Sequence, residues 1–212
     1  MAENIQNNKI SFLQISINTV FDNFKKAKLF TKFSQLQVDS INAVLQECEW
    51  QQVTDKRQIA YIFATGYHEA FDFNGKATGV IQRFVPIIEG GGEAYLRKKR
   101  YWPHVGYGLV QLTWLDNYKK MQKEIVKSGR FPGIDIVKNP KQALLPNVAA
   151  FIIVFGMKNG SFCVDKTTKK PLSLSTYFNK TTTNYVGARR MINPDKNGKL
   201  IEGYALQFLS CL

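Results

Sequence analysis

The spacing of hydrophobic positions predicts a mainly helical chain. After Ser34, apolar residues return every three or four positions, at Val38, Ile41 and Leu45, which is the period of a helix with one buried face. Ser34 and Gln37 have the spacing of a capping box, in which each residue caps the backbone of the other. A helix is therefore expected to begin directly after Ser34.

A second helix is expected to lie at the centre of the fold. Asp55 and Gln58 repeat the start signal, and the segment from there to about Glu69 is apolar over most of its surface. A helix that is hydrophobic on nearly all sides is buried in the interior of a protein. Glu69 then stands where this buried helix ends.

The rest of the chain continues the helical pattern without an internal repeat or a Gly/Ser linker. Further helices are expected at about 116–127, from Pro146 to before Gly160, at about 172–178 and 184–191, and from about 199 to 212. Residues 1–30 are weakly patterned and indicate an N-terminal extension or a poorly specified first helix. One mainly α domain is expected over residues 31–212.

Residues 72–110 interrupt this pattern. They hold isolated glycines, the run from Gly90 to Gly92, and prolines at 86 and 103. Long irregular stretches inside a compact domain are usually functional. We expect a long glycine-rich active-site loop with one small hairpin.

Composition excludes several classes of protein. At 212 residues with 44% hydrophobic side chains, the chain is long and apolar enough to build a core, unlike a disordered protein. The longest uncharged run, 142–157, is too short for a bilayer span, and residues 1–12 lack the apolar region of a secretory signal. Three cysteines are an odd number without metal-like spacing, which predicts neither a disulfide framework nor a zinc ribbon.

The net charge is +13, from 29 Lys and Arg against 16 Asp and Glu. Such an excess attracts polyanions: nucleic acid, anionic lipid or an acidic cell wall. No known nucleic-acid signature accompanies it, so nucleic acid is not the expected partner. A simply solubilising surface explains the charge equally well.

His68 and Glu69 close the second helix and are the first candidates for chemistry. His-Glu at the end of a helix also begins the H-E-x-x-H pattern of zinc proteases, which needs a second His four residues after the first. That position holds Asp72, and no metal or other cofactor is expected. A carboxyl at the end of an apolar helix is poorly solvated, which raises its pKa and suits a general acid. The alternative role for Glu69 is that of a structural hydrogen-bond acceptor.

A second carboxylate is available in the glycine-rich loop, as Glu89 or Glu93. Two carboxylates on opposite walls of a cleft are the minimum equipment for hydrolysis of a glycosidic bond. Gln111 and Thr113 follow, two residues apart, in a segment expected to be extended, where they would face the same side. Flat aromatic faces for sugar rings are offered by Tyr101, Trp102, Trp114 and Tyr118, although an aromatic-rich core loop would look the same.

Together these segments resemble the family 19 glycoside hydrolases, which include chitinases and phage endolysin-type muramidases. The pattern is carried by 60–69 (AYIFATGYHE), 86–89 (PIIE), 95–97 (YLR), 106–114 (GYGLVQLTW) with Asn117 and Tyr118, 177–179 (YFN), 188–193 (ARRMIN) and 203–205 (GYA). The segments follow the family's order across residues 34–212. The short spacing and the lack of cysteine pairs are similar to the phage and prophage branch.

The resemblance implies a lysozyme-like, two-lobed helical fold with a cleft between the lobes. Glu69 matches the family's general acid, Glu89 the general base, and Thr113 the hydroxyl that helps to position the attacking water. The sugar site would be lined by His68, Gln111, Trp114, Asn117 and Tyr118, with Asn193 in the family's Ile-Asn motif. The family inverts configuration, which requires carboxyl groups roughly 6.5–9.5 Å apart.

Two residues depart from the family pattern. Tyr107 stands where the family usually has Arg between two glycines, and Pro194 stands where Gly usually follows the Ile-Asn motif. The first change removes a fixed charge near the cleft, and the second requires a different local backbone. Glu93 competes with Glu89 for the role of base, but Glu89 keeps the family's local Pro-Ile-Ile-Glu pattern.

The function expected from the sequence is hydrolysis of the β-1,4 glycan bond of peptidoglycan by a phage endolysin. The +13 charge suits an anionic bacterial wall better than neutral chitin. The alternatives are a chitinase and a catalytically silent wall-binding or virion structural protein. A monomer is expected, held in the host cytoplasm before lysis or carried in a virion, with a holin or a virion component as partner.

Overall fold

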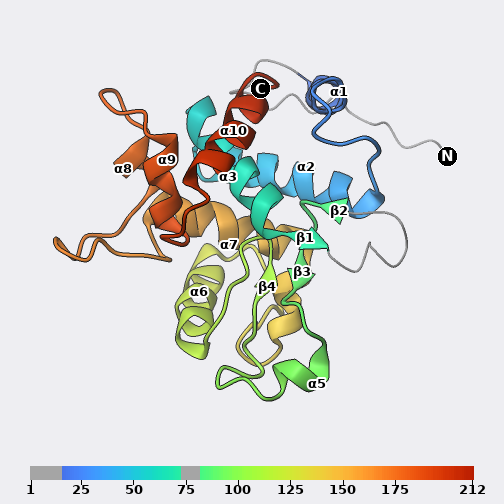
Figure 1. Ribbon diagram of the computed structural model, residues 1–212. Helices are drawn as coiled ribbons and strands as arrows, with labels where there is room; N and C mark the ends of the chain where they lie inside the picture. The colour runs from blue at the N-terminus through green and yellow to red at the C-terminus, as the bar shows by residue number, and fades with distance from the viewer. Residues whose placement is uncertain (1–15, 73–81) are drawn as a thin grey trace.

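The computed structural model describes residues 16–72 and 82–212 and is mainly helical, as the sequence predicts. Figure 1 shows the course of the chain. The helices are α1 (Ile17–Lys26), α2 (Gln35–Trp50), α3 (Lys56–Glu69), α5 (Glu93–Leu96), α6 (Leu115–Ser128), α7 (Pro146–Asn159), α8 (Leu174–Tyr177), α9 (Tyr185–Ala188) and α10 (Gly198–Leu209), with 3-10 turns η1 (Pro140–Leu144) and η2 (Arg189–Met191).

Local capping explains where α2 and α3 begin. Ser34 and Gln37 form the predicted capping box ahead of α2, with the Ser34 N–H donating to Gln37 Oε1 at 2.9 Å and the Gln37 N–H donating to Ser34 Oγ at 3.2 Å. Asp55 caps α3 by accepting from the Arg57 N–H at 2.9 Å. These side chains satisfy backbone groups that a helix end leaves unpaired, and the predicted starts of both helices are confirmed.

The second predicted helix, α3, is the centre of the core. Every residue from Ile59 to Gly66 is buried, and α10 packs along it, as Figure 1 shows. Phe63 of α3 stacks on Phe208 of α10 with ring centroids 5.4 Å apart. The prediction that this apolar helix is central is confirmed.

The described part of the predicted N-terminal extension joins the same core. Residues 17–26 form α1, in which Val20 and Phe24 are fully buried. The Phe24 ring contacts Phe63 at 5.6 Å and Phe208 at 5.1 Å between centroids. Residues 1–15 lie outside the described part of the chain.

The glycine-rich stretch holds two small antiparallel sheets where one hairpin was expected. β1 (Phe71–Asp72) pairs with β2 (Gln82–Arg83), and β3 (Ile87–Ile88) pairs with β4 (Tyr107–Gly108). The short helix α5 lies between β3 and β4 in sequence. Gly75 and Gly79, part of the predicted loop, fall outside the described residues.

Helix α7 lies between two groups of elements. Figure 1 shows α1, α2, α3 and α10 above it, and α5, α6, β3 and β4 below it. It packs against α2 and α3 on one side, while η1 connects to it and contacts β4. Among residues 16–72 and 82–212, the helices are all too short or too polar to span a bilayer.

Candidate functional site

Glu69 is the last residue of α3, and its side chain is 19% exposed. Its carboxylate accepts a hydrogen bond from Nη1 of Arg189, a side chain only 4% exposed. Arg189 is the first residue of η2 and stands 120 positions further along the chain. The fold therefore pairs the candidate acid with a buried cation.

Asp195 is the second partner of that cation. Arg189 donates through Nε to Oδ1 of Asp195 at 2.9 Å and through Nη2 to Oδ2 at 2.5 Å, the two-pronged geometry that makes arginine–carboxylate pairs strong. The hydrogen bonds from Arg189 hold the pKa of Asp195 well below its usual range. The charge of one guanidinium is shared between two carboxylates.

Arg189 and Asp195 were missed in the sequence. The available signal was that Arg189 lies in the 188–193 segment that resembles the family pattern. No local sequence pattern links Arg189 to Glu69, because the two residues are 120 positions apart in the chain. The expected poorly solvated carboxyl at the end of α3 is present, but with an ionic partner.

His68 lies beside Glu69 and is half-buried. Burial lowers the pKa of its imidazole below the ordinary value. The neutral ring is the form that both donates and accepts hydrogen bonds, so His68 suits contact with uncharged sugar hydroxyls.

Glu89 directly follows β3 and is fixed by three hydrogen bonds. Its backbone N–H donates to Gly106 O at 2.7 Å, while its carboxylate accepts from the Tyr101 hydroxyl at 2.7 Å and from the Gly106 N–H at 3.1 Å. The bond to Glu89 raises the pKa of Tyr101 to about 12, so Tyr101 keeps its proton and remains a donor.

Gly106 allows this close approach because it has no side chain. A Cβ atom at this position would lie 2.7 Å from Gln111 Oε1 and 3.3 Å from Glu89 Cβ. Glycine is thus the residue that lets the backbone approach the Gln111 and Glu89 side chains this closely.

Glu93 has a different environment from Glu89. It belongs to α5 and pairs with Arg97 one turn later, at 2.6 Å, with both side chains at least 60% exposed. Such surface pairs are worth little energetically. Of the two candidate bases, Glu89 is the one that the loop holds in a fixed position.

The segment carrying Gln111 and Thr113 is a turn, and the prediction of an extended segment was wrong. Tyr107 and Leu112 exchange two backbone hydrogen bonds, at 3.2 and 3.0 Å, and Gln111 has a left-handed backbone with φ of 54°. The Gln111 amide nitrogen donates to Ile87 O at 3.1 Å and to Gly108 O at 3.2 Å. Gln111 thus fastens the turn to β3.

Thr113 and Asn117 extend the same hydrogen-bonded loop. The Thr113 hydroxyl donates to Gln111 O at 2.8 Å, and the Asn117 amide nitrogen donates to Thr113 O at 2.8 Å. Each side chain keeps an acceptor oxygen for another partner. Both are half-buried, so they remain available to a ligand.

The aromatic residues of this region divide into two groups. Trp114 is 49% exposed and meets the Tyr101 ring edge-on at 5.0 Å, which leaves an aromatic surface beside Glu89. Tyr118 is fully buried, and its hydroxyl donates to Val105 O at 2.9 Å. The expectation that Tyr118 lines a sugar site was wrong, because its side chain belongs to the core. Tyr107 is also buried.

Asn193 lies on the exposed turn between Arg189 and Asp195. Its N–H donates to Arg189 O at 3.0 Å, and its carbonyl accepts from the Asp195 N–H at 2.8 Å. Pro194 occupies the point of the turn between these two bonds. The backbone around Asn193 therefore sets the position of Asp195 on Arg189.

The backbone limits the separation of Glu69 and Glu89. Ala70, next to Glu69, accepts from the Phe84 N–H at 3.0 Å, and Glu89 stands five residues after Phe84. Five residues span at most about 18 Å even when fully extended. The β1–β2 pairing thus limits how far Glu89 can lie from Glu69.

Within residues 16–72 and 82–212, no three His, Cys, Asp or Glu side chains gather as the ligands of a metal ion would. His104 is buried, with Nε2 3.0 Å from Val137 O.

No protein-family model matches the chain, and no curated protein matches it. The features that indicate a function are therefore the hydrogen-bonded surroundings of Glu69 and Glu89 and the sequence pattern around these two residues.

Proposed function

We propose that this protein is an inverting glycoside hydrolase that cleaves the β-1,4 glycan bond of bacterial peptidoglycan. The observation that carries the proposal is the pair of carboxylates, Glu69 at the end of α3 and Glu89 after β3, on segments linked by the hydrogen bond from Phe84 N–H to Ala70 O. Each is partly exposed and each is oriented by directed donors. The resemblance to the family 19 glycoside hydrolases supports the same two residues, in a lysozyme-like cleft between two lobes.

In this mechanism Glu69 is the general acid. It protonates the glycosidic oxygen as the bond to the anomeric carbon breaks. While Glu69 carries its proton, Arg189 still has Asp195 as an anionic partner. After the transfer, Arg189 stabilises the carboxylate that Glu69 has become, so the fold stabilises the product state of this step.

Glu89 is the general base. A carboxylate has about four sites for accepted hydrogen bonds, and Tyr101 and the Gly106 N–H occupy two of them. The remaining sites can bind a water and take its proton as its oxygen attacks the anomeric carbon from the opposite face. The Thr113 hydroxyl, which donates its own proton to Gln111 O, accepts a hydrogen bond from the other O–H of that water, and this hydrogen stays on the oxygen in the product hydroxyl.

The substrate proposal rests on charge. The +13 of the chain attracts an anionic wall, whereas chitin is neutral. A chitinase would use the same two carboxylates, and product analysis separates the two substrates. A silent wall-binding protein would have no use for both carboxylates, and its binding would survive their removal.

The test is digestion of purified sacculi by wild type, Glu69→Gln and Glu89→Gln, with soluble products identified by mass spectrometry. Each variant is expected to lose at least about 100-fold in rate, the contribution of one acid or base, while its circular dichroism stays unchanged. Glu93→Gln is the matched control, because it removes a loop carboxylate from an exposed ion pair. Near wild-type turnover by Glu69→Gln would contradict the proposal.

The same digest identifies the bond. Products from wild type alone with new reducing ends would establish a glycosidase, and the reducing sugar names the linkage that is cut. Release from chitin oligomers but not from sacculi would favour the chitinase. Binding to sacculi by every variant with no products from any of them would favour the silent structural protein.

A further inference from the structure

A groove runs between α6 and α7, and neither Glu69 nor Glu89 lines it. It consists of two hollows of about 460 and 530 Å³. Both are lined by Glu124 and Lys127 of α6 and by Phe155 and Asn159 of α7. Because these four residues line both hollows, the hollows are adjacent, and together they are named the α6–α7 groove.

One end of the α6–α7 groove reaches the candidate site. Leu112 and Asn117 line the first hollow, and the Asn117 side chain is bonded to Thr113 O. The other end reaches Trp50, which is 65% exposed. A chain lying in the groove would thus start beside Thr113 and lead away along α6.

The groove has an apolar floor and a basic rim. Phe151 and Phe155 stack at 5.3 Å between centroids within it. Its lining contains four cations and one acid, namely Lys120, Lys127, Arg130, Lys158 and Glu124. Arg130 is paired with Glu47 at 2.5 Å, so the lysines supply the excess positive charge.

The α6 wall of the groove is long enough for a short peptide. From Asn117 to Lys127 the helix rises about 15 Å, at 1.5 Å per residue. A tetrapeptide in extended form spans about 14 Å. Basic residues along a groove of this length select an acidic peptide over a neutral one.

We propose that the α6–α7 groove binds the acidic stem peptide of peptidoglycan, an inference that rests on the proposed function. The stem peptide branches from the sugar backbone and carries free carboxylates. With the glycan bound beside Thr113, the peptide enters at Asn117 and passes the Lys120 and Lys127 ammonium groups, while its aliphatic parts cover Phe155. This contact distinguishes peptidoglycan from chitin, which has no peptide.

The first experiment measures binding of an N-acetylated stem tetrapeptide to full-length Glu69→Gln protein by titration calorimetry. Adding Lys120→Glu and Lys127→Glu is expected to weaken binding at least about tenfold, since both charges along the peptide are reversed. The matched control adds Lys119→Glu and Lys123→Glu, two exposed lysines of α6 that are outside the lining of both hollows. The control changes net charge equally and is expected to leave affinity within about twofold.

The second experiment compares turnover by otherwise wild-type chains on peptidoglycan glycan with its peptides and on the same glycan after an amidase has removed them. The Lys120→Glu/Lys127→Glu pair is expected to lower kcat/KM on the first substrate and leave the second unchanged. Saturable tetrapeptide binding that fails in the groove variant supports the inference. No saturable binding at millimolar peptide, or equal loss in the control pair, would overturn it.

These outcomes are separable from the fate of the proposed function. Turnover of both glycans without tetrapeptide binding retains the hydrolase and rejects the peptide groove. Tetrapeptide binding without turnover by wild type retains the groove as an acidic-peptide site and rejects the hydrolase.

Discussion

The side chain of Arg189 connects two carboxylates from distant parts of the chain. Its guanidinium is 4% exposed and bonds Glu69 and Asp195, which come from the end of α3 and from the turn before α10. A buried cation is costly unless its charge is matched by partners in good geometry. Asp195 thus offsets part of the free-energy cost of burying Arg189, and so helps to hold a cation beside the candidate acid.

At this scale we predict a pH-dependent difference in stability between wild type and Asp195→Asn. The folded-state pKa of Asp195 is depressed by Arg189, so folding favours its charged form. The contribution of Asp195 is fully present above its unfolded pKa of about 3.9 and is lost as pH falls through the lower folded value. Unfolding free energies measured by urea titration from pH 3 to pH 7 should differ most at pH 6–7 and approach each other below about pH 4. A difference that does not change with pH would contradict this role for Asp195.

At the scale of elements, local signals were enough to predict some boundaries and not others. The caps of α2 and α3 act within three residues, so the sequence alone predicts them, from Ser34, Gln37 and Asp55. The turn at Gln111 depends on bonds to Ile87 and Gly108 and on a left-handed backbone at a residue other than glycine. Such a conformation is uncommon, and no local pattern predicts it.

In the candidate site too, local patterns predict some residues and long-range contacts determine the others. Glu69 could be placed at the end of a buried helix from periodicity alone. The loop pattern left Glu89 and Glu93 open, and the resemblance to the family favoured Glu89. The partner Arg189 could not be predicted, because it joins Glu69 only after the chain has folded across 120 positions. Tyr118 looked like a sugar contact because an aromatic side chain near a loop reads the same in sequence whether it faces solvent or the core; its full burial decides the matter.

The loop that holds Glu89 gives a prediction at this scale. In Gly106→Ala the new Cβ would meet Gln111 Oε1 at 2.7 Å and Glu89 Cβ at 3.3 Å, so one of the two side chains must move. Displacing a catalytic group by about 1 Å can cost up to about 100-fold in rate, and we expect a 10- to 100-fold loss of kcat/KM on sacculi. The control is Gly90→Ala, where an added Cβ meets no atom within 4 Å. Equal activities of the two variants would show that the loop tolerates the crowding.

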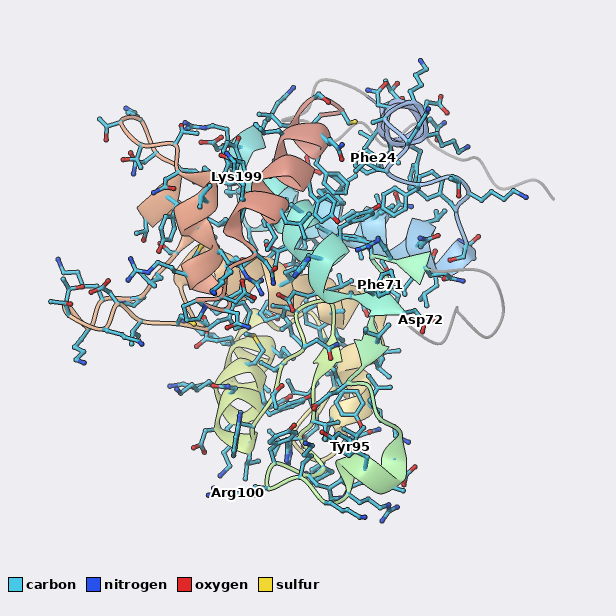
Figure 2. The ribbon with its side chains drawn as sticks, in the orientation of Figure 1. Phe24, Phe71, Asp72, Tyr95, Arg100 and Lys199 are labelled. Atoms are coloured by element: carbon cyan, nitrogen blue, oxygen red, sulfur yellow. The ribbon has the colours of Figure 1, made fainter. Side chains whose placement is uncertain are left out.

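At the scale of the whole molecule, one aromatic core holds helices from both ends of the described chain. Phe24, Phe63 and Phe208 come from α1, α3 and α10 and contact one another in pairs. Figure 2 places Phe24 in this crowded region, between α1 and the other helices. The segment expected to be an extension thus contributes, in its helical part, to the stability of the domain.

Truncation of one ring tests this contribution. Phe24 is fully buried, and Phe24→Ala is expected to lower the free energy of unfolding by about 3–5 kcal/mol, through lost transfer energy and the cavity left behind. Asn18→Ala, an exposed position on the same helix, should stay within about 0.5 kcal/mol. Urea denaturation followed by circular dichroism measures both. A loss below 1 kcal/mol in Phe24→Ala would mean that α1 packs on the domain only loosely.

The meeting of α1 with the C-terminal helix sets an order of events during synthesis. The Asn23 side-chain amide donates to Cys211 O at 3.0 Å across 188 residues, and at 5–20 residues per second a ribosome takes about 10 to 40 s to make that stretch. Until α10 has been made, Phe24 of α1 and Phe63 of α3 lack their contacts with Phe208. Glu69 lacks Arg189 for most of the same interval. A chain that ends before α10 lacks the Phe208 side of the aromatic core, so the proposed hydrolytic activity is expected only from chains translated through α10.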